Sequence, residues 1–176
     1  DASVDFSQTA VGDRWLSKAL RSKTVRVLGV EDSGHLVMSA PHPNGGRCLV
    51  GDGVASMIAV LCAMSRKERN PPFSKGFKRR VSISPSVRER WTGNNQLADR
   101  IEDIANKHLG QMKRSGLVGE ANLMLLENET VSIGVRNSGT QAKTNVSLRV
   151  VPETDPSRAL ETIEQIIATL QKELVN

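Results

Sequence analysis

The chain has 176 residues, of which 38% are hydrophobic and 24% charged, a composition typical of a soluble globular protein with one domain or two small ones. Aromatic residues make up only 3%, so we expect an aliphatic core. The sequence contains no apolar run long enough to span a membrane, no recognisable signal segment, and only two cysteines, too few for a disulfide framework or a cysteine metal site. These features predict a reducing, cytoplasmic setting.

The net charge of +5 is compatible with three kinds of anionic partner, namely nucleic acid, a membrane surface or a small anionic molecule. The densest basic run covers residues 75–80 and contains one aromatic side chain, without finger or heptad spacing around it. We interpret this run as the solvated end of a linker, with a nucleic-acid patch as the alternative.

The first part of the chain is predicted to mix helix and strand. Residues 11–21 have apolar side chains at helical spacing and predict a helix. Strands are predicted over 25–30 and 36–39, joined by a polar corner at 31–35. Residues 40–50 contain two prolines and a Gly-Gly pair, which predict a loop.

A second helix is predicted over residues 54–64, with Asp52 as its N-cap. Apolar residues occupy nearly every face of this helix, which predicts that it is deeply buried. The following segment, 67–80, contains a Pro-Pro pair and the basic run. We take it as a linker between two domains, 1–66 and 81–176.

The second domain is predicted as strand, helix, three strands and helix. The strands are expected at about 80–84, 121–127, 130–136 and 144–151, and the helices at 94–109 and after Asp155. Each helix has one apolar stripe, and one antiparallel sheet with both helices on one face would bury both stripes. The predicted fold class is therefore an α/β fragment followed by an α+β domain.

The turn between the last two predicted strands has the side chains that a phosphate dianion requires. Arg136 offers a bidentate contact and Lys143 a point charge. Ser138 and Thr140 offer hydroxyls, and Gly139 allows a close approach of backbone N–H groups. By composition alone, a solvated hairpin loop is the alternative.

The polar corner at 31–35 has side chains that suit a sugar. Glu31 can accept hydrogen bonds from two adjacent hydroxyls, Ser33 can donate or accept, and Gly34 permits a sharp bend. His35 could transfer a proton near neutral pH. On these residues alone, an ordinary hairpin turn with a surface histidine is the alternative.

Four segments, in this order along the chain, resemble motifs of the α-D-phosphohexomutases, the family of the phosphoglucomutases, phosphomannomutases and phosphoglucosamine mutases. Residues 9–14 resemble T-x-V-G-D-R, residues 28–35 the sugar-binding loop G-E-x-S-G-H, residues 51–53 the helix start T-G-D-G, and residues 136–143 the phosphate-binding loop R-x-S-G-T-E-P.

The resemblance implies that residues 1–66 form the later half of the family's domain 3. It also implies that residues 81–176 form domain 4, which is similar to half of a TATA-binding protein. Members of the family move a phosphoryl group between the 1- and 6-positions of a hexose through a bisphosphorylated intermediate. The expected ligand is therefore a hexose phosphate.

The resemblance also implies roles for individual residues. Glu31, Ser33 and Gly34 would contact the sugar, with Arg14 as an accessory contact, and His35 would lie near the reacting centre and transfer a proton. The phosphate would be held by the loop residues already named, which are Arg136, Ser138, Gly139, Thr140 and Lys143. A symmetric set of contacts to the sugar suits a reaction in which the sugar must reverse its orientation between the two half-reactions.

The sequence departs from the family pattern at several positions. Val30 replaces a glycine, Gln141-Ala142 replaces Glu-Pro, and Asn145 replaces the second arginine of the loop. We expect the lost cation to weaken the phosphate grip, with Lys143 compensating in part.

Neither the family's phosphoserine loop nor its D-G-D-x-D-R magnesium loop is found in this sequence. We therefore expect this chain to bind no metal or cofactor itself, with magnesium used by the full-length family enzyme. We predict that the chain is inactive alone and that its partner is the missing N-terminal part of a mutase. The alternatives are a stand-alone phosphosugar-binding or regulatory module and, third, a basic nucleic-acid-binding domain.

Overall fold

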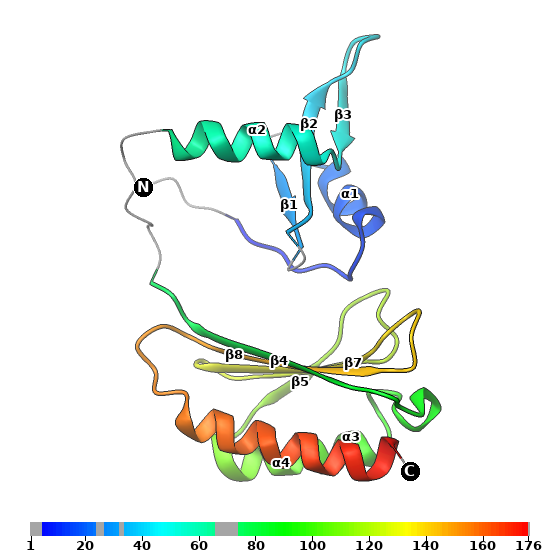
Figure 1. Cartoon of the computed structure of the whole chain (residues 1–176), viewed down its shortest axis with the longest axis vertical. Helices are drawn as coiled ribbons and strands as arrows, with labels where there is room; N and C mark the ends of the chain where they lie inside the picture. The colour runs from blue at the N-terminus through cyan, green and yellow to red at the C-terminus, as the bar shows by residue number, and fades with distance from the viewer. Residues whose placement is uncertain (1–4, 24–26, 32–33, 66–73, 176) are drawn as a thin grey trace. The chain divides into compact units, whose positions relative to one another are not determined.

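The computed structural model describes residues 5–23, 27–31, 34–65 and 74–175 (Figure 1). The chain divides into two compact units, residues 1–72 and residues 73–176. Among the described residues, no helix combines the length and the apolar character that crossing a membrane would need.

The first unit contains a three-stranded antiparallel sheet in the order β1-β2-β3, with two helices. Its elements are α1 (Asp13–Arg21), β1 (Leu28–Val30), β2 (Leu36–Pro41), β3 (Arg47–Val50) and α2 (Gly53–Met64). The helix α1 packs on the sheet through Leu16, which is buried. A Cβ atom at Gly29 would lie 3.1 Å from the Leu16 Cβ atom, so glycine lets helix and strand approach closely.

The loop predicted over residues 40–50 is wrong, because the chain forms a hairpin there. The strand β2 continues to Pro41, which pairs with Arg47 at the start of β3. Gly45 and Gly46 form the turn with φ values of +85° and +83°, a conformation that glycine adopts without strain. Pro41 is tolerated because it is the last residue of β2. The prolines and glycines that predicted a loop belong instead to a hairpin.

The helix α2 and its cap are confirmed, but its predicted deep burial is wrong. The Asp52 Oδ1 atom accepts hydrogen bonds from the backbone N–H groups of Val54, at 2.7 Å, and Ala55, at 3.0 Å. None of the residues of α2 is buried, and the exposure of its six exposed large apolar residues runs from 45% at Val60 to 65% at Val54. A helix that is apolar on all sides needs several neighbours, and the described part of the first unit supplies too few.

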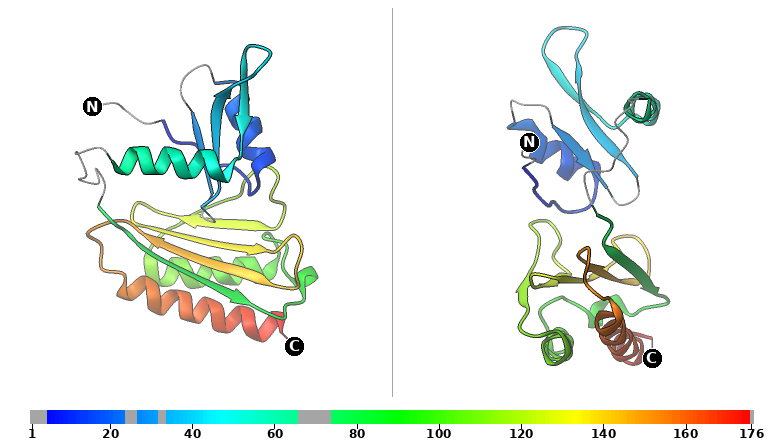
Figure 2. Two further views of the ribbon diagram at one scale, coloured as in Figure 1. Left: turned by 45° about the horizontal axis from the view of Figure 1, so that its top comes forward. Right: turned by 90° about the vertical axis from the view of Figure 1, so that its left-hand side faces the viewer.

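The second unit is a five-stranded antiparallel sheet in the order β4-β8-β7-β6-β5, with two helices on one face (Figure 2). Its elements are β4 (Phe77–Ile83), the 3₁₀ turn η1 (Arg88–Arg90), α3 (Gln96–Leu109), β5 (Lys113–Ser115), β6 (Leu123–Glu127), β7 (Val131–Asn137), β8 (Thr144–Val150) and α4 (Ser157–Leu174). The predicted antiparallel sheet and its two helices on one face are confirmed.

One aliphatic core lies between this sheet and its two helices, as expected from the low aromatic content. Its largest fully buried side chains include Trp91, Ile133, Leu148, Ile166 and Leu170. The single tryptophan of this unit donates its Nε1–H to the carbonyl oxygen of Asn122 at 3.0 Å, so its one polar atom is satisfied.

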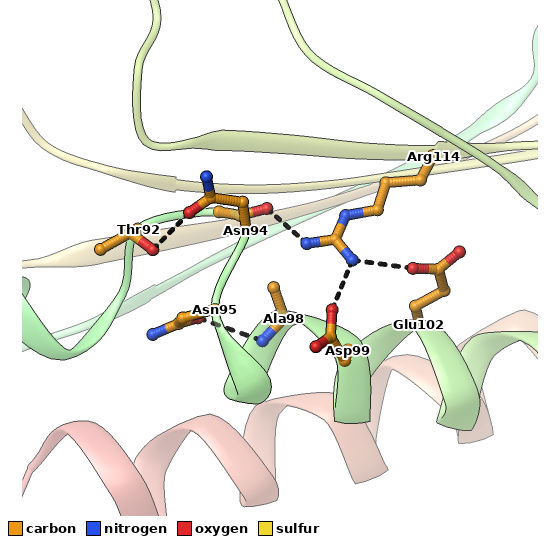
Figure 3. Close-up of polar contacts among 8 residues, drawn as sticks. Thr92, Asn94, Asn95, Ala98, Asp99, Glu102 and Arg114 are labelled. Atoms are coloured by element: carbon orange, nitrogen blue, oxygen red, sulfur yellow. Dashed lines mark hydrogen bonds and ion pairs between the residues drawn. The ribbon is translucent and has the colours of Figure 1, made fainter.

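The strand β5 was not predicted, because its three residues are polar and too few to form a pattern. Its central residue, Arg114, extends over the start of α3 (Figure 3). The guanidinium donates to the Asp99 carboxylate at 2.7 Å, to the Glu102 carboxylate at 2.9 Å and to the Gly93 carbonyl oxygen at 2.9 Å. The hydrogen bond to Asp99 raises the pKa of Arg114 above its ordinary value. This network ties β5 to the helix layer.

The basic run at 75–80 is part of an edge strand, which corrects its interpretation as a linker end. From Phe77 onward it belongs to β4, which pairs with β8 along its whole length. Lys78 and Arg80 are exposed, whereas Arg79 lies on the opposite face and pairs with Glu164 of α4 at 2.5 Å.

Candidate functional site

Two of the four motif segments meet in the first unit, at the turn that joins β1 to β2. The backbone N–H of Gly12, which precedes α1, donates to the Glu31 Oε1 atom at 2.6 Å. The next residue, Asp13, places its Oδ1 atom 2.7 Å from the Nδ1 atom of His35. Two polar contacts therefore join the segments 9–14 and 28–35. Gly12 contacts Glu31 at one end of the turn, and Asp13 contacts His35 at the other end.

Two backbone hydrogen bonds join the described residues at the ends of this turn. The N–H of Glu31 donates to the His35 carbonyl oxygen at 2.9 Å, and the N–H of Gly34 donates to the Glu31 carbonyl oxygen at 2.9 Å. Gly34 was predicted to permit a sharp bend, and its φ of +89° is a conformation that favours glycine. Ser33, the predicted sugar contact, lies outside the described residues.

The third motif segment, at 51–53, packs against the same pair of side chains. A Cβ atom at Gly51 would lie 3.3 Å from the Asp13 Oδ2 atom and 3.3 Å from the His35 Nε2 atom. Glycine at this position lets the backbone pass close to the imidazole and the carboxylate. Beyond it, a cavity of about 320 Å³ is lined by Gly34 and His35 on one side and by α2, from Gly53 onward, on the other.

Arg14, predicted as an accessory contact, lies in the first turn of α1 next to Asp13. Its guanidinium carbon is 5.4 Å from the centroid of the Trp15 ring, a cation–π distance. Arg14 therefore follows Asp13 directly in α1, and its guanidinium lies near the Trp15 ring.

The ligand atoms of Asp13, Glu31 and His35 lie within 4.8 Å of one another, the geometry of a possible metal site. This cluster does not suit magnesium. Magnesium prefers six oxygen ligands, whereas one ligand here is an imidazole nitrogen at hydrogen-bond distance from the Asp13 carboxylate.

The fourth motif segment forms the turn between β7 and β8 in the second unit. Arg136, near the end of β7, pairs with Glu120 at 3.0 Å, and both side chains are largely buried. The Ser138 Oγ atom accepts hydrogen bonds from the backbone N–H groups of Thr140, at 3.4 Å, and Gln141, at 3.3 Å. The Ser138 N–H donates to the Lys143 carbonyl oxygen at 2.8 Å and closes the turn.

The other three predicted phosphate contacts in this turn are less buried than Ser138. Gly139 and Thr140 are exposed, and a Cβ atom at Gly139 would meet nothing within 4 Å. Lys143 is half-buried. The five predicted phosphate contacts therefore lie at the end of β7 and in the turn that follows it, but Arg136 pairs with a carboxylate that the sequence did not identify as its partner.

A buried polar network beneath this loop was also missed by the sequence analysis. Asn137 donates its side-chain N–H groups to the carbonyl oxygens of Arg88, at 2.8 Å, and Trp91, at 2.9 Å. The Thr144 hydroxyl donates to the Asn137 Oδ1 atom at 2.8 Å and lies 2.7 Å from the Ser86 hydroxyl. These residues fix both ends of the loop to η1 and its flanks. A signal was present, since polar residues stand at both strand ends beside the turn.

Asn145, which replaces the second arginine of the family loop, also has a structural contact. Its side chain is buried in β8, and its Oδ1 atom accepts a hydrogen bond from the Ser82 hydroxyl at 2.7 Å. This position therefore joins β8 to β4 through a neutral side chain where the family has a cation.

Comparison with known proteins agrees with these local resemblances. Residues 1–80 match the family described as phosphoglucomutase/phosphomannomutase, alpha/beta/alpha domain III. The chain is 29% identical over 173 residues to a phosphoglucosamine mutase of Shewanella loihica. This alignment covers 98% of this chain and 33% of that protein. Phosphoglucosamine mutases of Haemophilus ducreyi, at 27% identity over 172 residues, and of Acidothermus cellulolyticus, at 29% over 164 residues, give similar matches.

The chain spans about a third of the length of these curated relatives, and the matches cover nearly all of the chain. The domain match at residues 1–80 agrees with the three motif segments of the first unit. Together these matches support a similarity of this chain to the C-terminal part of the phosphohexomutases.

Proposed function

We propose that this chain supplies the sugar-binding and phosphate-binding groups of a phosphohexomutase. The observation that carries the proposal is the meeting of the motif segments around Glu31 and His35 in the first unit, where Gly12 N–H and Asp13 hold the two side chains. A carboxylate and an imidazole on one turn, beside a cavity, can accept and exchange protons with adjacent sugar hydroxyls.

The loop after β7 holds the phosphate in this proposal. A guanidinium has five N–H donors in a fixed plane, and the contact with Glu120 uses the Nη1 atom of Arg136. Donors therefore remain for a phosphate oxygen, and the exposed Gly139 and Thr140 offer backbone and hydroxyl donors next to it. The Lys143 ammonium adds a point charge on the same turn.

In this proposal the chain does not catalyse phosphoryl transfer alone. The phosphorylated nucleophile and the magnesium ion would come from the N-terminal part of a mutase, which would also cover the apolar surface of α2. The exposed side chains of this helix and the one-third coverage of the relatives support that arrangement. Because the relatives are phosphoglucosamine mutases, we propose glucosamine phosphate as the hexose phosphate to test first.

The test is a calorimetric titration of the whole chain with glucosamine 6-phosphate, alone and after addition of the N-terminal two-thirds of the Shewanella loihica enzyme. We expect no turnover by the chain alone, and saturable binding that Arg136→Ala weakens more than tenfold, or about 1.4 kcal/mol. The matched control is Arg80→Ala, which removes an exposed arginine of β4 and should leave binding unchanged.

Three results discriminate among the candidate functions. Turnover by the chain alone would refute the proposed dependence on an N-terminal part. Full binding without that part, and no turnover with it, would favour a stand-alone phosphosugar-binding module. Absence of binding in both conditions would refute the proposed function.

A further inference from the structure

The pair formed by Asp13 and His35 has a consequence that depends on which imidazole nitrogen faces the carboxylate. The Asp13 Oδ1 atom lies 2.7 Å from Nδ1, not from Nε2. A carboxylate only accepts hydrogen bonds, so Nδ1 must carry a proton in this contact. In the neutral ring the other nitrogen, Nε2, is then an unprotonated acceptor.

Hydrogen bonds of the neighbouring residues support the contact between Asp13 and His35. Asp13 is the first residue of α1, and Gly12 before it adopts a φ of +115°, which favours glycine. The N–H of Gly12 donates a hydrogen bond to Glu31 Oε1, and the N–H of Glu31 donates one to the carbonyl oxygen of His35. The start of α1 is thus joined to the turn by the Gly12–Glu31 hydrogen bond in addition to the Asp13–His35 contact, which limits how far the carboxylate and the imidazole can separate.

The imidazole is accessible, because the His35 side chain is 41% exposed. Gly51 is the close neighbour there, and a side chain at that position would begin 3.3 Å from Nε2. The cavity lined by Gly34, His35 and α2 lies next to it. The imidazole is therefore held at its Nδ1 atom, while the ring remains partly exposed beside this cavity.

We propose that Asp13 is a positioning residue that fixes His35 in its Nδ1–H tautomer, so that Nε2 exchanges a proton with a sugar hydroxyl. This inference rests on the proposed function for its sugar, but the tautomer itself is a property of this chain. When Nε2 accepts the hydroxyl proton, the ring becomes an imidazolium and the Asp13 carboxylate stays ionised and stabilises it. The return of the proton restores the starting tautomer.

The chain provides an internal contrast for the test. In the β2–β3 hairpin, the backbone N–H of Asn44 donates to the Nδ1 atom of His42 at 3.2 Å. This nitrogen must be unprotonated to accept, so His42 is expected in the opposite tautomer, with the proton on Nε2. The two histidines of the first unit should therefore differ within a single spectrum.

The experiment is a long-range ¹H–¹⁵N correlation spectrum of the ¹⁵N-labelled whole chain, at a pH where titration of the ring signals shows both histidines to be neutral. We expect a protonated Nδ1 and an unprotonated Nε2 for His35, and the reverse for His42. In Asp13→Ala, His35 should change to the Nε2–H form while His42 is unchanged. Asp103→Ala, which removes an exposed aspartate of α3, is the matched control.

An Nε2–H form of His35 in the wild type, or an unchanged tautomer in Asp13→Ala, would overturn the proposal. Asp13→Asn keeps the shape of the side chain, so a spectrum with native backbone signals guards against a variant that fails to fold. This readout does not need a bound sugar, and it judges the pairing even if the proposed function fails.

The second readout uses the complemented enzyme of the binding experiment. We expect Asp13→Ala to lower kcat at least tenfold with little change in KM, and Asp13→Asn to lower it less if its Oδ1 atom still accepts from Nδ1–H. Wild-type kcat in Asp13→Ala, with kcat abolished in His35→Ala, would refute the positioning role. Wild-type kcat in His35→Ala would instead refute the proton-transfer role of His35 itself.

Discussion

Replacing Asn137 with alanine removes the centre of the polar network beneath the loop between β7 and β8. The side chain makes three hydrogen bonds, two as donor to the carbonyl oxygens of Arg88 and Trp91 and one as acceptor from the Thr144 hydroxyl. It is only 7% exposed, so water has little access to the partners that the change leaves behind.

The expected loss follows from the number of bonds and their burial. A typical intramolecular hydrogen bond contributes about 1 kcal/mol net, and buried groups left without a partner cost about 1–3 kcal/mol each. Since the Thr144 hydroxyl still lies 2.7 Å from Ser86, only the two carbonyl oxygens are left without this donor. We therefore expect Asn137→Ala to lower the free energy of unfolding of the second unit by about 3 kcal/mol.

The assay is urea unfolding followed by tryptophan fluorescence. The chain has two tryptophans, and Trp15→Phe as background leaves the fully buried Trp91 as the reporter of the second unit. Asn94→Ala, an exposed asparagine that accepts a hydrogen bond from Thr92, is the matched control and should change stability by less than about 0.5 kcal/mol. A loss below about 1 kcal/mol in Asn137→Ala would refute the assigned role of the network.

Two further predictions concern charged groups away from the loop. The Ser157 hydroxyl and backbone N–H donate to the Asp155 carboxylate at 2.8 and 3.1 Å and lower the pKa of Asp155, so Ser157→Ala should raise that pKa in an NMR titration. Because the pKa of Asp155 is depressed in the folded state, the extra stability of the wild type over Ser157→Ala should be present above the ordinary carboxyl pKa. It should be lost as the pH falls through the lowered pKa. A stability difference between the two proteins that instead grows in acid would contradict this. Arg114→Met keeps much of the aliphatic stem but loses three hydrogen bonds, and we expect a loss of about 1–2 kcal/mol in urea unfolding that shrinks at high salt. An unchanged midpoint would show that the network around Arg114 contributes little.

The fold of the second unit was predictable because its elements are long and their apolar residues repeat with a clear period. The stripes of α3 and α4 and the alternation along β7 and β8 all require the same sheet-and-helix arrangement. The strand β5 gave no such signal, because three polar residues have no recognisable period and are held by Arg114 through tertiary contacts. Short strands of this kind are specified by their neighbours.

The errors in the first unit have a different origin. Pro41 and the two glycines at 45–46 are compatible with both a loop and a hairpin, and only the partner strand decides between them. The exposure of α2 could not be read from its composition either. An apolar helix predicts that something covers it, but composition does not say whether the cover lies in the same chain.

For the candidate site, the sequence identified the segments but not their contacts. The resemblance located Glu31, His35 and the loop from Arg136 to Lys143. It did not show that Asp13 contacts His35 or that Glu120 contacts Arg136, because each pair joins residues at least 16 positions apart. Asn137 and Thr144 were missed because polar residues beside a turn resemble a solvated loop, whereas here they are buried.

The arrangement of charge on the outer strands of the five-stranded sheet has a consequence for self-association. The two ends of the strand order are β4, which carries the exposed Lys78 and Arg80, and β5, which has only three residues. A long, flat, apolar edge would offer its backbone to a strand of another molecule, whereas lysine and arginine repel a second copy of the same edge and a short strand offers little to pair with. The basic run thus favours a dispersed protein at low ionic strength, and we expect that protection to weaken as salt screens the charges.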